Sequence, residues 1–171
     1  MAKWNTLAVD FPDLRVVNLG VEGSATLPDG QMLAGVIKLV DEKVIPMRPR
    51  IVVLYIGEND LWKGVTPEEV HDGIRLITAK LEKALPKTKI VYVALKPSPS
   101  RLGIVDQAVA TDILLQQDTW SDPHLRFADV FNWMLDDRGE VRLDLFTPDQ
   151  LHMLASGYEI WTYVIRQALQ K

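Results

Sequence analysis

Four short runs of apolar, largely β-branched residues limit most strongly how this chain can fold. They are residues 15–19 (RVVNL), 50–56 (RIVVLYI), 89–95 (KIVYVAL) and 125–130 (LRFADV). Each run has the composition of a β-strand, and longer segments with helical spacing separate the runs. Strands that are apolar along nearly their whole length are buried on both faces. The pattern therefore predicts an α/β fold in which helices cover both faces of a parallel sheet.

The most clearly marked helix is predicted at residues 67–85. Its apolar positions fall on one stripe, formed by Val70, Ile74, Ile77, Leu81 and Leu85. Thr66 is a good N-cap, Pro67 suits the first helical position, and Glu69 completes a capping box. Further helices are predicted at residues 2–9, 31–44 and 104–117, and through residues 158–168 to the C-terminus.

The chain has the size and composition of one globular domain. Its length of 171 residues is short for two domains, and no internal repeat or linker divides it. Hydrophobic residues make up 47% and charged residues 25%, which argues against a disordered or coiled-coil chain. We expect a single domain over residues 1–171.

Charge and residue usage exclude several classes of function. The net charge is −4 and the basic residues are scattered, so a nucleic acid partner is not expected. Cysteine is absent and there are three histidines, His71, His124 and His152, which leaves little for a metal site or a thiol nucleophile. We expect no metal and no cofactor.

The apolar segments also bear on location. The longest uninterrupted apolar run, residues 51–56, is far too short to span a bilayer, and the start MAKWNTLAVD has no apolar signal segment. We expect a cytoplasmic protein that does not bind a membrane.

In a sheet of this type the ligand lies beyond the carboxyl ends of the strands, so the loops that follow strands are the candidate positions of functional residues. The first such loop is residues 18–24 (NLGVEGS). Its backbone N–H groups can point at an anion or a developing oxyanion. The alternative is that Gly20 and Gly23 are only turn residues. The glycine spacing does not fit a dinucleotide-binding loop.

The second loop is residues 57–60 (GEND), which places polar groups directly after an apolar strand. The Asn59 side chain can donate two hydrogen bonds without carrying charge, which suits an oxyanion donor. The alternative is that Asn59 forms an Asx-turn leading into Leu61 and Trp62.

A third block, residues 147–152 (TPDQLH), places Asp149 and His152 three residues apart ahead of the last helix. On a helical turn these two side chains share a face, so Asp149 can accept a hydrogen bond from one ring nitrogen and leave the other as a base. The alternative is a structural pair with no catalytic role.

Taken in order, the three blocks resemble the SGNH hydrolases, also called GDSL-type esterases, over essentially the whole chain. The resemblance implies a three-layer, flavodoxin-like α/β fold. It also implies that Gly23 and Asn59 form the oxyanion hole and that Asp149 orients His152 as the general base. Glu22 departs from the family pattern, which usually has a small residue there.

The nucleophile of the family is not found in this sequence. Family members begin with a buried strand that ends in a Gly-Asp-Ser or Gly-Ser-Ser turn, and Met1 to Trp4 already corresponds to the helix beyond it. None of the chain's serines Ser24, Ser98, Ser100, Ser121 and Ser156 matches that position, so each is interpreted as a turn or capping residue. The nucleophile is therefore left unassigned.

The resulting expectation is a carboxylic-ester hydrolase that acts on short acyl esters, with His152 activating water directly. The main alternative is an inactive domain that binds acyl or carbohydrate esters without hydrolysing them. A flavodoxin-like cofactor-binding protein is a third possibility, but it would need a phosphate loop that the sequence lacks.

The missing first strand also predicts an assembly. In the strand order 2-1-3-4-5 that the resemblance implies, this strand lies between residues 15–19 and residues 50–56. Its loss leaves unpaired strand edges, which folded proteins pair or cover. We therefore expect a homodimer whose interface involves residues 2–19.

Overall fold

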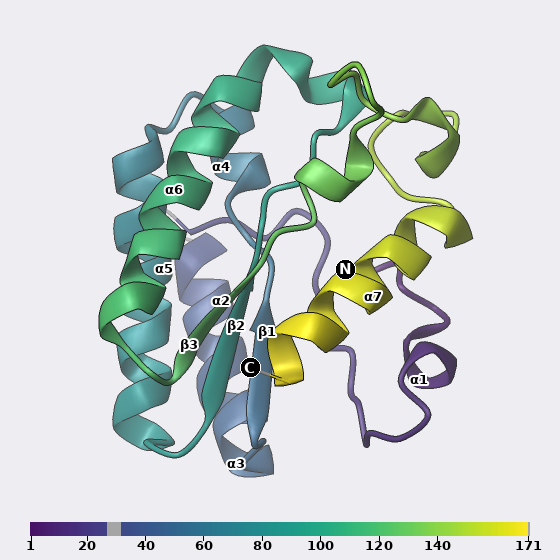
Figure 1. Ribbon diagram of the computed structural model, residues 1–171. Coiled ribbons are helices and arrows are strands. Elements are labelled where there is room, and N and C mark those ends of the chain that lie inside the picture. The colour runs from purple at the N-terminus through teal and green to yellow at the C-terminus, as the bar shows by residue number, and fades with distance from the viewer. Residues whose placement is uncertain (27–31, 171) are drawn as a thin grey trace.

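The computed structural model describes residues 1–26 and 32–170, and it confirms the α/β fold (Figure 1). A three-stranded parallel sheet has the order β1-β2-β3, with β1 at Ile51–Leu54, β2 at Lys89–Val93 and β3 at Leu125–Ala128. These strands correspond to three of the four predicted runs. Every second residue of β2 points to the same face, so each face of the central strand carries its own apolar core.

Helices cover both faces of the sheet (Figure 1). On one face, α5 (Pro67–Ala84) and α6 (Val105–Ser121) pack over Ile90 and Tyr92. On the other face, α7 (Ala155–Gln170) packs over Val91 and Val93, together with Trp4 of the N-terminal segment. The predicted three-layer arrangement is present.

Helix α5 begins where the sequence predicts. The Thr66 hydroxyl accepts the Glu69 N–H at 3.3 Å, and the Glu69 carboxylate accepts the Thr66 N–H at 3.1 Å, so the capping box is formed. The predicted stripe lies in the core, with Val70 and Ile77 completely buried.

The remaining helices lie close to their predicted positions. Helix α2 (Met32–Leu39) continues through a π-helical turn, η1 (Val40–Val44), into α3 (Ile45–Met47), while Gln31, the predicted first residue, lies outside the described residues. The other elements are α4 (Glu58–Trp62) and the 3-10 turns η2 (Pro99–Ile104), η3 (Asn132–Met134) and η4 (Leu143–Leu145). In the described ranges, no helix is long and apolar enough to cross a bilayer.

Two predictions for the N-terminal segment are wrong. Residues 15–19 are extended but form no strand, because a strand requires a hydrogen-bonded neighbour and none of the described strands pairs with them. The helix predicted at residues 2–9 is reduced to α1 (Leu7–Asp10). The helix begins later than predicted because Trp4 is buried in the core. The Trp4 indole N–H donates to the Asp10 carboxylate at 2.6 Å.

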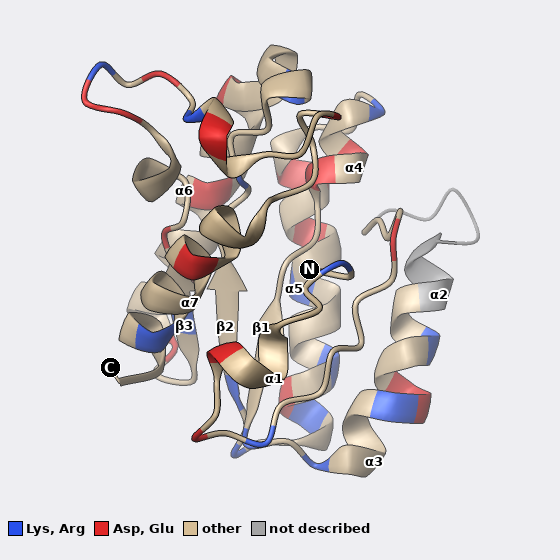
Figure 2. Cartoon of the chain, turned by 90° about the vertical axis from the view of Figure 1, so that its right-hand side faces the viewer, with Lys and Arg blue, Asp and Glu red and all other residues tan. Residues whose placement is uncertain are grey.

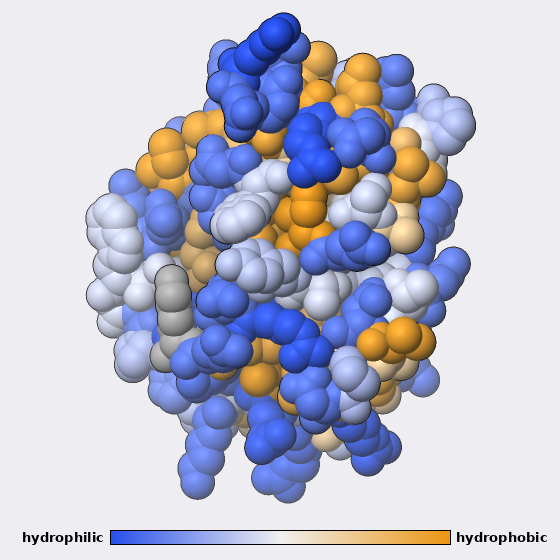
Figure 3. Space-filling model, turned by 45° about the vertical axis from the view of Figure 1, so that its right-hand side comes forward, coloured by the Kyte–Doolittle hydropathy of each residue, from blue (hydrophilic) through white to orange (hydrophobic). Residues whose placement is uncertain are grey.

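Residues 15–19 run beside β1 without pairing with it. Figure 2 shows this part of the chain on the side of β1 that faces away from β2. The same view shows basic and acidic residues interspersed over the molecule. On the face shown in Figure 3, hydrophobic side chains appear in several areas between hydrophilic ones. Between the segment and β1 lies a cavity of about 900 Å³.

Candidate active site

The polar groups singled out in the sequence gather at the carboxyl end of β1. The chain leaves β1, turns sharply at Gly57 and enters α4 at once. Gly57 has φ +119°, and a Cβ atom there would lie 2.7 Å from Val70 Cγ1, so only glycine fits this turn. The turn places Glu58 and Asn59 at the end of the sheet.

The Asn59 side chain is held from both ends. Its Nδ2 donates to the carbonyl oxygen of Ser24 at 3.0 Å, and its Oδ1 accepts from Nη2 of Arg101 at 3.0 Å. These two bonds fix the orientation of the side-chain amide, with Nδ2 toward Ser24 and Oδ1 toward Arg101. An Asx-turn would instead bond the side chain to the backbone a few residues along the chain, so the Asx-turn alternative does not describe these contacts. Because an amide nitrogen carries two hydrogens, Asn59 keeps one for a ligand.

The turn that carries Gly23 is tied to α4. Gly23 has φ +73°, and the Ser24 hydroxyl donates to the carbonyl of Val21 at 2.8 Å. Two residues later, the Thr26 N–H donates to the buried Asp60 carboxylate at 2.7 Å. Gly23 and Asn59 consequently line the same cavity.

Asp149 and His152 form a direct contact, with Nδ1 of His152 2.6 Å from Oδ2 of Asp149. They do not lie on a helical turn as predicted. Gln150 between them has φ +56°, and the segment is a non-helical turn closed by the Thr147 N–H donating to the His152 carbonyl at 2.8 Å. The side chains still meet because the Asp149 carboxylate also accepts the backbone N–H groups of Leu151 and His152, both at 2.9 Å.

The Asp149 carboxylate is stabilised in its charged form. A hydrogen bond from the Thr147 hydroxyl at 2.6 Å, together with those from His152 and Leu151, holds the pKa of Asp149 well below its usual range. An ionised Asp149 keeps the proton on Nδ1 of His152 and leaves Nε2 as the acceptor. His152 lines the cavity together with Gly23 and Asn59.

A buried charged cluster beneath these residues was missed by the sequence analysis. The Lys96 ammonium donates to both carboxylate oxygens of Glu58, at 2.9 and 2.7 Å, and to the Ser98 hydroxyl at 2.7 Å. The Tyr55 hydroxyl donates to Glu58 at 2.6 Å. The only sequence signal was a charged residue within two positions of the end of each of two apolar runs, Glu58 after residues 50–56 and Lys96 after residues 89–95.

The two charges of this pair are mutually dependent. Burial alone would raise the pKa of Glu58, but the Lys96 ammonium and the hydrogen bonds from Ser98 and Tyr55 hold it below its usual value. Burial raises the pKa of Tyr55 well above its usual value, so Tyr55 stays neutral and acts as a donor to Glu58. Arg101 lies beside this pair and over the Trp62 ring, 5.6 Å from its centroid.

The serines are engaged in structural contacts. The hydroxyls of Ser24, Ser100, Ser121 and Ser156 each donate to a backbone carbonyl, and Ser98 is buried in the charged cluster. Among the described residues, none of these hydroxyls bonds to His152. The nucleophile stays unassigned. The described residues also contain no group of three or more His, Asp or Glu side chains that could bind a metal ion.

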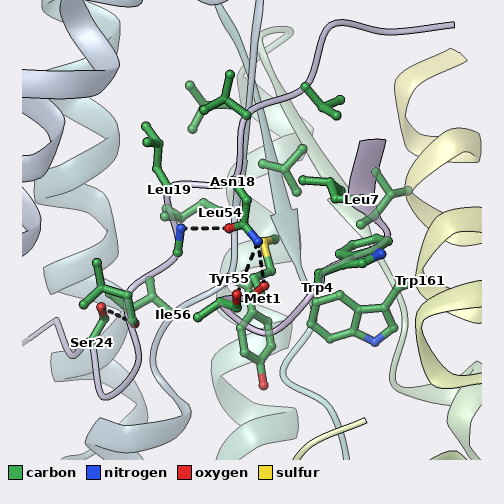
Figure 4. A pocket seen from close by; sticks show the side chains of 18 of the residues that line it. Met1, Trp4, Leu7, Asn18, Leu19, Ser24, Leu54, Tyr55, Ile56 and Trp161 are labelled. Atoms are coloured by element: carbon green, nitrogen blue, oxygen red, sulfur yellow. Dashed lines mark hydrogen bonds between the residues drawn. The ribbon is translucent and has the colours of Figure 1, made fainter. Parts of the chain in front are cut away.

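The cavity runs from these polar groups along the whole of β1. It reaches from Asn59 and His152 at one end to Pro49 at the other. Figure 4 shows its apolar wall, to which Trp4, Leu19, Leu54, Ile56 and Trp161 contribute. The arrangement can therefore hold a carbonyl group at its polar end with apolar surface beside it.

A family model described as the GDSL-like lipase/acylhydrolase family matches residues 2–160. Among curated proteins, platelet-activating factor acetylhydrolase IB subunit alpha2 of Gallus gallus is 25% identical over 150 residues, covering 86% of this chain and 61% of the relative. The alpha1 subunit of Homo sapiens is 26% identical over 152 residues, with coverage of 86% and 61%. The chain thus spans about 61% of the length of the curated relatives it matches.

Solved structures show the same fold. A putative platelet activating factor from Streptococcus pneumonia superposes with a TM-score of 0.80 at 20% identity, covering 98% of this chain and 79% of that one. An acetylxylan esterase from Geobacillus stearothermophilus superposes with a TM-score of 0.73 at 18% identity, with coverage of 95% and 76%.

Proposed function

This chain belongs to the GDSL-like lipase/acylhydrolase family, and from that premise we propose that it hydrolyses carboxylic esters with short acyl groups. The observation that carries the proposal is the 2.6 Å contact between Asp149 and His152, which stands at the same cavity as Asn59 and Gly23. Two similar proteins, an acetylhydrolase and an acetylxylan esterase by name, support a small acyl group.

In the proposed reaction the ester carbonyl oxygen lies at the Gly23 N–H and the second hydrogen of Asn59 Nδ2. Nε2 of His152 accepts a proton from water as the water oxygen bonds to the carbonyl carbon. The negative charge that develops on the carbonyl oxygen is stabilised by the two donors. His152 then gives its proton to the departing alkoxide, and the products are an alcohol and a carboxylic acid.

The proposed rate is low, because water replaces a serine nucleophile. Removing the serine from a comparable triad lowers turnover by about 10⁶ and leaves roughly 10³ to 10⁴ over the uncatalysed rate. Activated esters, whose leaving groups need little help, are therefore the suitable substrates.

The test is hydrolysis of a p-nitrophenyl ester series, from acetate to longer acyl groups, by the parent chain and by His152→Ala and Asn59→Ala. We expect acetate to react fastest and both variants to fall to the uncatalysed rate. Ser24→Ala is the matched control, because among the described residues its hydroxyl bonds only to the Val21 carbonyl. A His152→Ala variant with the parental rate would show the proposal to be wrong.

The second candidate is an inactive domain that binds acyl or carbohydrate esters. The observation in its favour is that the serine hydroxyls are engaged elsewhere while Asn59 and Gly23 still line an accessible cavity. Saturable binding of an ester that the parent chain leaves intact would support this candidate and exclude the first.

We also propose a homodimer formed through residues 2–19. The segment carries apolar side chains on its outer surface, where Val9 is 77% exposed and Val17 55% exposed. Light scattering tests the proposal, and a stable monomer across micromolar concentrations would contradict it.

A further inference from the structure

We propose that Arg101 is a positioning residue of the candidate active site, which holds the side-chain amide of Asn59 so that its free Nδ2 hydrogen faces the ester carbonyl oxygen. The inference rests on the proposed function, because it concerns the oxyanion donor of that reaction. Its evidence is the set of contacts around the Arg101 guanidinium, together with the bonds that tie the neighbouring Ser100 to the turn of His152.

The orientation of an asparagine amide is decided by its hydrogen bonds. The last torsion of the side chain is broad and two-fold, so the torsion alone does not favour one orientation. For Asn59 the two partners are the Ser24 carbonyl and Arg101. Ser24 follows three exposed residues, 21–23, and its N–H closes their turn through a 3.4 Å bond to the Val21 carbonyl. A partner on such a turn is a weak anchor, so the orientation of the amide depends on Arg101.

Arg101 is held on three sides. Nη1 lies 3.8 Å from Oε1 of Glu58, and the guanidinium lies 5.6 Å from the centroid of the Trp62 ring. The backbone N–H of Arg101 donates to the carbonyl of Ser98 at 2.8 Å. The planar guanidinium thus reaches two consecutive residues of α4, with Nη1 toward Glu58 and Nη2 toward Asn59. A lysine ammonium is a point charge and cannot reproduce this geometry.

The contact with Arg101 also strengthens Asn59 as a donor. Oδ1 of Asn59 accepts a charge-assisted hydrogen bond at 3.0 Å. Because hydrogen bonds in a chain polarise one another, a cation at Oδ1 makes the Nδ2 hydrogens stronger donors. This gain acts on the negative charge that develops in the transition state, so it should affect kcat more than KM.

The segment that carries Arg101 is also bonded to the turn of the proposed general base. Ser100 donates to the Gln150 carbonyl twice, from its backbone N–H and from its hydroxyl, both at 3.0 Å. Gln150 lies two residues before His152 and has φ +56°. Ser100 and Arg101 therefore connect the donor Asn59 to the base His152, which are far apart in the sequence. The position of Arg101 sets where the donor stands relative to the base.

The test compares Arg101→Ala with the parent chain, using p-nitrophenyl acetate and the nuclear magnetic resonance signals of the Asn59 side-chain amide. Loss of a whole oxyanion donor lowers kcat about 10²- to 10³-fold, so we expect a fall of about 10- to 100-fold, with KM changed by less than about twofold. Solvent exchange of the Asn59 Nδ2 hydrogens should become about tenfold faster, as the loss of one hydrogen bond implies.

Arg142→Ala serves as the matched control for this comparison. Arg142 pairs with Asp144 at 3.0 Å and lines a separate pocket with Trp133 and Tyr163. Its removal also takes away an arginine that is paired with a carboxylate, but it should leave kcat and the exchange of Asn59 unchanged.

Added methylguanidinium gives a reading that a purely structural role does not move. Arg101→Ala leaves space for a guanidinium group beside Glu58 and Trp62, so methylguanidinium should restore part of kcat and slow the exchange of Asn59. Methylammonium carries the same charge without the planar donors and should restore less. Arg101→Lys should fall between the parent and Arg101→Ala, and it takes the place of the alanine variant if circular dichroism shows that variant to be unfolded.

Unchanged exchange of Asn59 in the Arg101 variants would overturn the proposal. A raised KM with unchanged kcat would also overturn it, because Arg101 would then act by binding the substrate itself. If the parent chain hydrolyses no ester, the proposed function fails, and the exchange and rescue measurements still decide whether Arg101 positions Asn59.

Discussion

Strands β1 and β2 have nearly the same composition and very different surroundings. Ile90, Val91, Tyr92 and Val93 of β2 are 0–2% exposed, whereas every residue of β1 is partly exposed. Among the described residues, β2 is hydrogen-bonded to a strand on each side and β1 to a strand on one side. Burial of an apolar strand is therefore decided by its neighbours in the sheet and not by its own residues.

The same contrast continues into the candidate site. At the end of β2, Lys96 is enclosed by Glu58, Ser98 and Tyr55. On the open side of β1, Gly23 is exposed and its turn is held through Asn59 and Asp60. The closed side is held by buried hydrogen bonds, and the open side keeps the accessible surface that a substrate or partner needs.

The largest effect is expected when the same charged residue is introduced into each strand, which tests whether β1 and β2 differ in burial. Val53 and Val91 are register partners. Val91→Asp buries a carboxylate in the core without a partner, so we expect a loss of more than about 4 kcal/mol or no cooperative unfolding at all. Val53→Asp can reach the cavity, and we expect it to fold with a smaller loss. Urea denaturation measures both, and equal losses would contradict the distinction between the two strands.

The next largest effect is expected at the buried pair that joins the ends of the two strands. Glu58→Ala leaves the Lys96 ammonium buried without its main partner, which costs about 3–5 kcal/mol. The free energy of unfolding in urea measures this loss.

The control for this prediction is the double variant Glu58→Leu with Lys96→Leu. Replacing both charges by apolar groups removes the unpaired charge, so the double variant should lose much less stability than Glu58→Ala. A double variant that is as unstable as the single one would show that the ion pair itself, and not the unpaired charge, stabilises the fold.

A smaller effect is expected where β1 ends. Gly57→Ala forces an L residue into φ +119° and places its Cβ 2.7 Å from Val70 Cγ1, so we expect a loss of about 1–3 kcal/mol. Gly64→Ala is the matched control, because Gly64 has φ +87° and no atom within 4 Å of the added Cβ. If thermal unfolding shows equal losses, the contact with Val70 contributes nothing.

The sequence predicted features that depend on local chemistry. The start of α5 follows from Thr66, Pro67 and Glu69, which are neighbours in the chain. The contact between Asp149 and His152 was also predicted, although the helical turn offered as its reason is absent, because the carboxylate reaches the imidazole through a different turn.

Features that depend on distant neighbours were not predicted. Residues 15–19 have the composition of a strand, but strand formation requires a partner that the described chain does not supply. The pairing of Lys96 with Glu58 depends on the parallel register of β1 and β2, which brings residues 38 apart in sequence together. Single-sequence patterns carry no information on that register.

The smallest expected effect distinguishes the exposed Asp149–His152 pair from the buried one, through its dependence on pH. The folded-state pKa of Asp149 lies well below its usual value, because of hydrogen bonds from Thr147 and His152. Its ionised form therefore stabilises the fold above the unfolded-state pKa of about 3.9, and this contribution is lost as the pH falls through the folded-state value. Asp149→Asn should lose stability at neutral pH and approach the parent chain in acid. Thr147→Val, which removes the largest cause of the shift, should reproduce part of that change in urea midpoints measured from about pH 6 to pH 3. A constant difference between parent and Asp149→Asn over this range would mean that the charge of Asp149 is not what stabilises the turn.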